Sequence, residues 1–234
     1  MRQRFFQIAI LLLIFENAGH SQDCSSSPLF RQGKQFVFLD EIASSAKGVP
    51  AKTTKKIYMI DSVKEQAGEL HASIKEPGQE SERQDGSTKS TATQSHITGI
   101  ICNGHSISYI TTVKSSSVNF VLVNEFPMNM KIGDKFKDQV IKLGKSNDKK
   151  NNIPDFSIYI HRSVVGQELV TTLAGKWKCF KIAETTTSVI ASKNGQSPTS
   201  INSPDTNYTW FSADIGIVKM TMGSFHTLTL VGLP

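Results

Sequence analysis

The sequence predicts an all-β protein, built as a single antiparallel β-barrel or sandwich of about 11–12 short strands in mostly up-and-down order. Runs rich in Val, Ile, Thr, Tyr and Phe recur along the chain, and turn residues separate them about every 8–12 positions. After the N-terminal segment we find no apolar repeat of helical period. The chain of 234 residues fits one all-β domain, and strands that follow each other in sequence usually pair.

The first residues have the layout of a secretory signal peptide. Two arginines precede an apolar stretch over residues 5–15, which is too short to cross a bilayer as a helix because a crossing takes about 20 residues. The polar flank that follows also argues against an uncleaved anchor. Gly19 and Ser21 fit the small residues before a cleavage site, so we expect residues 1–21 to be the signal peptide. Residues 22–234 then form one all-β domain with no further transmembrane span.

The three cysteines bear on pairing and on lipidation. Export would expose them to an oxidising compartment, and an odd number leaves three possible pairings open. Cys179 lies inside an apolar-flanked strand, whereas Cys24 and Cys102 lie at the ends of elements. We therefore predict a Cys24–Cys102 disulfide and a buried free thiol at Cys179. Cys24 also stands where a lipoprotein cysteine would, but Asp23 replaces the small residue that lipidation requires.

The first half of the chain contains strand candidates and two distinct kinds of connection. The strands are expected at residues 34–41, 56–63, 70–74, 96–102, 105–113 and 118–124. Asn103-Gly104 predicts a two-residue type I′ hairpin turn, in which both residues take a positive φ. Residues 77–95 are polar and lack any apolar period, which predicts a long mobile loop.

The second half continues the pattern of strands and turns. Residues 132–135 predict a turn, and the polar region of residues 194–204 predicts a longer connection. The strands are expected at residues 136–143, 156–165, 168–172, 177–191, 208–212, 215–222 and 226–231.

No motif in the sequence supports a catalytic residue. Gly144-Lys145-Ser146 lacks the second glycine and the following helix of a serine nucleophile elbow. Cys102 and His105 could form a thiol–imidazole pair across the hairpin, but no third group is evident that would orient the imidazole ring. We expect no enzyme activity and no catalytic residues.

Metal, cofactor and nucleic-acid sites are not expected either. No histidine stands at metal-ligand spacing from another histidine or from a cysteine pair, and the sequence lacks a phosphate-binding glycine loop. The formal net charge of +6 is mild for this length. The basic clusters at residues 52–56 and 145–150 lack the aromatic residues of a nucleic-acid surface. Asn207-Tyr208-Thr209 fits a glycosylation sequon, a pattern that often occurs by chance.

Four segments together resemble the TapB-like family of exported bacterial proteins, whose domain has no known function. Residues 162–182 (RSVVGQELVTTLAGKWKCFKI) resemble its G-x-E-x-V-T-T-P-A-G-x-F-x-C-x-K-I segment, and residues 208–219 (YTWFSADIGIVK) resemble W-Y-A-x-G-V-G-L-V-K. Residues 130–135 (MKIGDK) resemble L-K-V-G-D-K, and residues 28–36 resemble the opening P-L-x-x-G-x-x-F. The chain departs from these patterns at Leu173, Trp177 and Asp214. The resemblance implies a β-barrel-like domain in the envelope of a Gram-negative bacterium.

Two glycines in the matched segments have expected structural roles. Ala174-Gly175 before a long strand predicts a tight turn with positive φ at Gly175. Gly216, inside a strand candidate, predicts a bulge or a bend at a barrel corner.

These observations favour a non-catalytic exported protein, in the periplasm or at the cell surface, over two other classes. We expect it to be a monomer that binds a lipid, another apolar ligand, a glycan or an envelope protein, since a barrel of this size can enclose an apolar cavity. The alternative is an assembly accessory that docks on an outer-membrane partner through an exposed strand edge. The third class is a hydrolase whose site is assembled from distant residues. A closed barrel with a cavity would favour ligand binding, and a filled core with an uncovered edge strand would favour docking.

Overall fold

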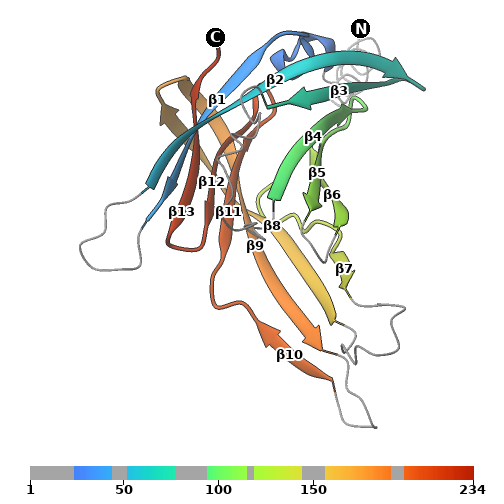
Figure 1. Cartoon of the computed structure of the whole chain (residues 1–234), viewed down its shortest axis with the longest axis vertical. Coiled ribbons are helices and arrows are strands. Elements are labelled where there is room, and N and C mark those ends of the chain that lie inside the picture. The colour runs from blue at the N-terminus through green and yellow to red at the C-terminus, as the bar shows by residue number, and fades with distance from the viewer. Residues whose placement is uncertain (1–23, 44–51, 77–93, 115–118, 144–155, 191–197) are drawn as a thin grey trace, which may run out of the picture.

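The structure of this protein is a computed structural model, which describes residues 24–43, 52–76, 94–114, 119–143, 156–190 and 198–234 (Figure 1). The expected signal peptide and residues 77–93 of the expected mobile loop lie outside the described residues. Within the described residues there are thirteen β-strands and two short 3₁₀ helices, and no helix there is long and apolar enough to cross a membrane. The strands are β1 (Gln35–Ile42), β2 (Lys52–Gln66), β3 (Glu69–Lys75), β4 (Gln94–Cys102), β5 (Ser106–Lys114), β6 (Asn119–Pro127), β7 (Gln139–Leu143), β8 (Phe156–Thr172), β9 (Gly175–Ile190), β10 (Thr199–Asn202), β11 (Asn207–Ser212), β12 (Gly216–Met222) and β13 (His226–Gly232).

All strands belong to one sheet, and the described pairings are antiparallel. The hydrogen-bonded order is β6-β5-β4-β3-β2-β1-β13-β12-β11-β9-β8-β7, with β10 attached to β9 as a side branch. Along this path most neighbours are also neighbours in sequence, as the up-and-down prediction requires. The pairing of the first and last strands, β1 and β13, unites the two halves of the chain, and β9 also pairs with β11, past β10.

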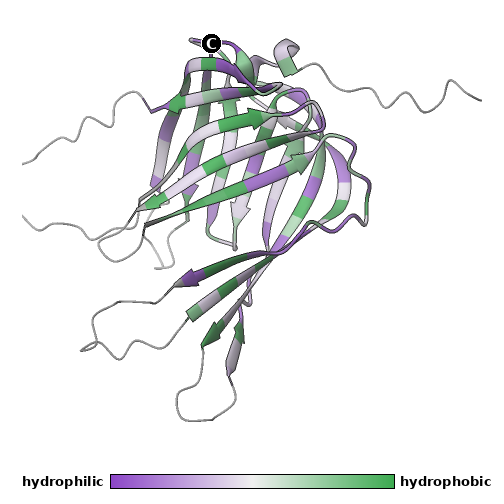
Figure 2. Cartoon of the chain, turned by 90° about the vertical axis from the view of Figure 1, so that its right-hand side faces the viewer, coloured by the Kyte–Doolittle hydropathy of each residue, from purple (hydrophilic) through white to green (hydrophobic). Residues whose placement is uncertain are grey.

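The sheet curls into a half-barrel (Figure 2). This confirms the predicted fold class and narrows it, because β6 and β7 stand at the two ends of the strand order and do not pair with each other. Strand direction alternates at each step along twelve strands, so the two end strands run antiparallel to each other where the sheet curls round.

Aromatic and aliphatic side chains fill the concave side of the half-barrel. The Phe126 ring stacks on Phe211 with centroids 4.6 Å apart, and Tyr109 meets Phe126 edge to face at 5.8 Å. Strand alternation explains this core, because residues two apart in each strand project to the same face. The fully buried side chains on it include Ile60, Ile100, Ile107, Ile182, Phe211 and Leu230.

The N-terminal 3₁₀ helices η1 (Cys24–Ser26) and η2 (Pro28–Phe30) pack on this core. The Ser27 hydroxyl accepts a hydrogen bond from the Leu29 N–H, and Pro28 occupies the first helical position, where its missing N–H costs nothing. Leu29 is only 2% exposed as a result.

The hairpin between β4 and β5 differs from the prediction by one residue. The central residues are Gly104 and His105 rather than Asn103 and Gly104, and only Gly104 has a positive φ, of 81°. Glycine at the first central position is typical of a type II′ turn. The Asn103 side chain decides the shift, because its Oδ1 accepts hydrogen bonds from the N–H groups of His105 and Ser106.

Other differences concern the ends and continuity of strands. β4 begins at Gln94, two residues inside the stretch predicted as loop, and β10 forms within the region predicted as a turn. The two strands predicted at 156–165 and 168–172 are one strand, β8, whose register shifts between Val164 and Gly166. The extra residue forms a β-bulge, so the strand continues where the sequence pattern predicted that it would end.

Candidate functional site between two sheet edges

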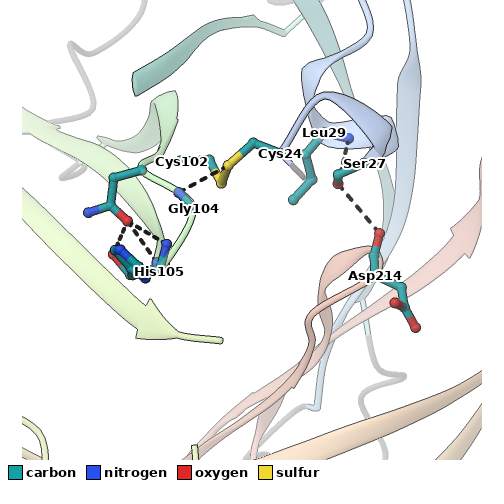
Figure 3. The surroundings of a disulfide bond; sticks show 9 residues. Cys24, Ser27, Leu29, Cys102, Gly104, His105 and Asp214 are labelled. Carbon is teal, nitrogen blue, oxygen red and sulfur yellow. Dashed lines mark hydrogen bonds between the residues drawn. A yellow bond between two sulfur atoms is a disulfide. The ribbon is translucent and has the colours of Figure 1, made fainter. Parts of the chain in front are cut away.

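The cysteines form the disulfide expected from their positions. A bond joins Cys24 to Cys102, whose Cα atoms lie 6.0 Å apart, and ties η1 to the end of β4 (Figure 3). Because Cys102 is in this bond, it supplies no free thiol to His105, and the thiol–imidazole pair is absent. Cys179 is free and buried, and burial together with the charge of Glu168 raises its pKa to about 12. That pKa makes the thiol unreactive at neutral pH.

Histidines and carboxylates pair with each other at separate places. His161 lies 2.9 Å from Asp138, and His71 lies 3.3 Å from Glu69. His226 bonds to the buried Asp40, which also pairs with Lys56 at 2.8 Å. Within the described ranges, no group of three His, Cys, Asp or Glu residues could hold a metal ion.

The interior of the half-barrel is filled. The apolar cavity there, lined by residues such as Phe38, Tyr58 and Tyr109, has a volume of about 30 Å³. One water molecule takes about that volume in the liquid, whereas pockets for small molecules usually measure about 300–1,000 Å³. This cavity, lined by described residues, is therefore too small for a lipid or a sugar.

One open hollow of the described residues lies between the two end strands. This hollow of about 430 Å³ is lined by residues 120–123 of β6 and 139–142 of β7, and we call it the slot. Its rims are apolar, because Val121, Val123 and Val140 are 59%, 47% and 45% exposed. Uncovered strand edges usually carry lysine or proline that discourages pairing, but β6 has no lysine and its proline stands at its last residue.

The backbone of β6 is directed into the slot at alternate residues. The carbonyl of Val123 accepts a hydrogen bond of 2.6 Å from the Gln139 amide, and the carbonyl of Glu125 accepts one of 3.4 Å from Arg162. In an antiparallel strand the N–H and C=O of one residue point the same way, and the pairing of β6 with β5 has no register shift. Val121, Val123 and Glu125 thus direct their backbone groups away from β5, toward the gap between the two end strands.

A larger hollow of about 620 Å³ continues from the slot toward the half-barrel. Val123, Glu125 and Gln139 line it from the two edges, residues 134–138 form its far side, and Arg162 of β8 also lines it. Arg162 is 7% exposed, and its guanidinium carbon lies 4.9 Å from the Phe136 ring centroid and 5.6 Å from that of Phe126. Burial lowers the pKa of Arg162, while the charges of Glu184 and Glu125 raise it.

Four buried polar atoms of the described residues have no hydrogen-bond partner there. Two lie at this junction, Arg162 Nε, a donor, and Gln139 Oε1, an acceptor; the others are Trp177 Nε1 and Ser212 Oγ. Such atoms are few in native proteins, and each calls for an explanation, such as a bound water, an ion or a partner group. The sequence analysis missed both Arg162 and Gln139. The only sequence signal for this site was an arginine among the apolar residues of a strand. The hollow that Arg162 lines is formed by residues far apart in sequence, so the sequence pattern did not reveal it.

Comparison with known proteins places the chain in a family. Residues 51–221, which include every strand from β2 to β11 and nearly all of β12, match the DUF3108-like family. The chain belongs to the DUF3108-like family. The match does not extend to the TapB-like proteins in particular, so that finer resemblance is not shown. None of the curated proteins compared with the chain matches it.

Two solved structures resemble this DUF3108-like protein to different degrees. A Bacteroides fragilis protein classed as exported, with a YmcC-like fold, is 16% identical, with a TM-score of 0.50 over 87% of this chain and 96% of its own. A Parabacteroides distasonis protein classed as a lipoprotein is also 16% identical, with a TM-score of 0.49 over 91% of this chain and all of its own. The first likeness supports the architecture, and at this identity it shows the fold alone.

Proposed function

We propose that this DUF3108-like protein is an exported, non-catalytic protein of the bacterial envelope that docks an extended segment of a partner protein along β6. One observation carries the proposal: the core cavity is small, while the two end strands leave an apolar edge on a slot, with no strand of the described residues paired to it. A segment that adds to such an edge gains main-chain hydrogen bonds and side-chain contacts together. The docking alternative therefore takes precedence over a lipid or glycan enclosed by the barrel.

The location in the envelope is part of the same proposal. The signal-peptide pattern supports it, as does the disulfide, since disulfides persist in oxidising compartments. The structural neighbour classed as exported is compatible with it. The proposal assigns no catalytic residue.

The test is photo-crosslinking in the bacterium that makes the protein. A benzophenone amino acid at Val140, which faces the slot from β7, should give an adduct with a partner protein. The same amino acid at Lys178, an exposed position on β9, should give none. An equal yield at both positions would contradict the proposal, and so would a lipid adduct or the lack of any adduct.

A second substitution tests whether the β6 backbone makes the contact. Val121→Pro removes an N–H that faces the slot and spares the bonds to β5, because those come from the alternate residues. We expect it to abolish the adduct at Val140. Val121→Thr, the matched control, keeps the N–H and should keep the adduct. If proline and threonine behave alike, main-chain pairing is not the mode of docking.

A further inference from the structure

Arg162 is a buried cation on which the charges of Glu184, its partner on β9, and Glu125 act without a hydrogen bond to either carboxylate. The described residues offer no carboxylate within 4 Å of its guanidinium, and its single hydrogen bond, from Nη1 to the Glu125 carbonyl, is long. The rings of Phe126 and Phe136 offset part of the cost of burying the charge. A buried charge that lacks a hydrogen-bonded counter-ion is otherwise expensive.

The charged side chains that line the large hollow are equal in number for the two signs: Glu125, Asp134 and Asp138 against Lys135, Lys137 and Arg162. Of its carboxylates, Asp138 is paired with His161, and Asp134 accepts the N–H of Lys131 at 2.7 Å. Glu125 remains as a negative group on the rim. Lys135 and Lys137 line the same hollow and form no ion pair with any described residue. The hollow is therefore electrically balanced, and the case for a negative group rests on Arg162 itself, which is buried and has no carboxylate within 4 Å among the described residues.

We propose that Arg162 binds a carboxylate of the polypeptide that docks along β6, so that the partner segment is acidic at the residue that reaches the large hollow. The inference rests on the proposed docking function and names the chemistry of its partner. Arginine presents a planar fork that matches a carboxylate with two parallel hydrogen bonds, and Nε–H is one arm of that fork. Arg162 Nε is the atom left without a partner here.

The two orphan atoms fit a polypeptide better than they fit a free anion. Gln139 Oε1 needs a donor, which a backbone N–H supplies, whereas Arg162 Nε needs an acceptor. Gln139 and Arg162 already bond to the carbonyls of Val123 and Glu125, so both lie at the level of the β6 groups that face the slot. An extended segment on β6 would bring its N–H groups and an acidic side chain to this place together.

The probe is a phage library of random decapeptides, selected on the purified, disulfide-bonded protein. We expect peptides that bind the wild type but not Val121→Pro, with Asp or Glu enriched at one fixed position. For a selected synthetic peptide, replacing that residue by Asn or Gln should weaken binding at least about tenfold on the wild-type protein. This comparison needs no protein variant and is unaffected by changes in folding.

Variants of the protein test whether the guanidinium of Arg162 causes the preference for the acidic peptide. On the Arg162→Gln protein, the affinities for the acidic peptide and for its amide version should differ by no more than about twofold. On the Arg162→Lys protein, this difference should lie between those of the wild type and of Arg162→Gln, because lysine keeps the charge but loses the planar fork. Val121→Pro should weaken both peptides alike. Peptides that depend on β6 but show no acidic preference would overturn the role of Arg162 and leave docking intact. A library that yields no peptide sensitive to Val121→Pro would overturn both proposals.

Discussion

At the scale of single residues, Gly216 shows how one position joins distant parts of the core. Its φ is 83°, and a Cβ built on it would lie 1.9 Å from the Tyr109 hydroxyl and 3.0 Å from a Leu29 methyl. The same hydroxyl accepts a hydrogen bond of 3.2 Å from the Ile217 N–H. The predicted bulge is present beside it, since β11 and β12 shift register between Trp210 and Phe211.

Gly216→Ala should therefore destabilise the protein by about 2–4 kcal/mol, through the strained φ and through displacement of Tyr109. Urea unfolding measures the loss. Gly33→Ala is the matched control, because Gly33 has a φ of 78° and nothing within 4 Å of the added Cβ. It should cost only about 1–2 kcal/mol. Equal losses in the two variants would refute the close packing of Tyr109 against Gly216.

Asp40 makes the stability of the folded protein depend on pH in the acidic range. Burial raises the pKa of this carboxyl, but bonds to Lys56 and His226 outweigh burial and lower the pKa below its usual 3.8. A lowered folded-state pKa adds stability above the unfolded value, and that stability is lost as the pH falls through the folded value. We expect the free energy of unfolding to drop below about pH 4 in part through Asp40.

Asp40→Asn should lower the free energy of unfolding at pH 6 by about 1–3 kcal/mol, because a hydrogen-bonded buried charge is lost. The variant should also show a smaller further decrease between about pH 4 and pH 3 than the wild type. Asp61→Asn, at an exposed position, is the control. An unchanged acid slope in Asp40→Asn would contradict the assignment.

At the scale of elements, the N-terminal 3₁₀ segment depends on one covalent bond and a small set of contacts. Cys24 is bonded to Cys102 across 78 residues of sequence, and Ser27 Oγ reaches the Asp214 carbonyl at 3.4 Å. Removing the bond in the double variant Cys24→Ser/Cys102→Ser should lower stability by about 2–5 kcal/mol. Reductant should lower the melting temperature of the wild type and leave that of the double variant unchanged.

Cys179→Ala is the control for this bond. It should keep the sensitivity to reductant, because Cys179 is free. Peptide mapping of the unreduced protein completes the test, and a bridge that contains Cys179 would refute the pairing.

The same scale shows which local signals predict an element. The alternating strands, the turn at Gly133 and the positive φ of Gly175 follow from local residue types, and the structure confirms each of them. β10 has no such signal, because its four residues are all exposed and form a strand only by pairing with β9. The β4–β5 turn lies one residue later than predicted, because the Asn103 side chain accepts hydrogen bonds from the backbone N–H groups of His105 and Ser106.

At the scale of the whole molecule, the pairing of β1 with β13 places the opening of the barrel in the middle of the chain. The chain passes from β6 to β7 through residues 128–138, and the sheet stays unpaired at that step. Gln139 and Arg162 bridge part of the gap with side chains. The result is a filled core beside an open edge, the combination that favours docking over enclosure of a ligand.

The sequence by itself determined the all-β class, the up-and-down order and the cysteines that lie at element ends. These follow from local alternation and turn chemistry, which act over a few residues. Only the tertiary structure decided that β6 and β7 do not pair and that the core is filled. It also decided that Arg162 Nε and Gln139 Oε1 have no hydrogen-bond partner among the described residues. Those features depend on how the sheet curls and on side chains packed from strands far apart in sequence, and no short stretch of sequence encodes them.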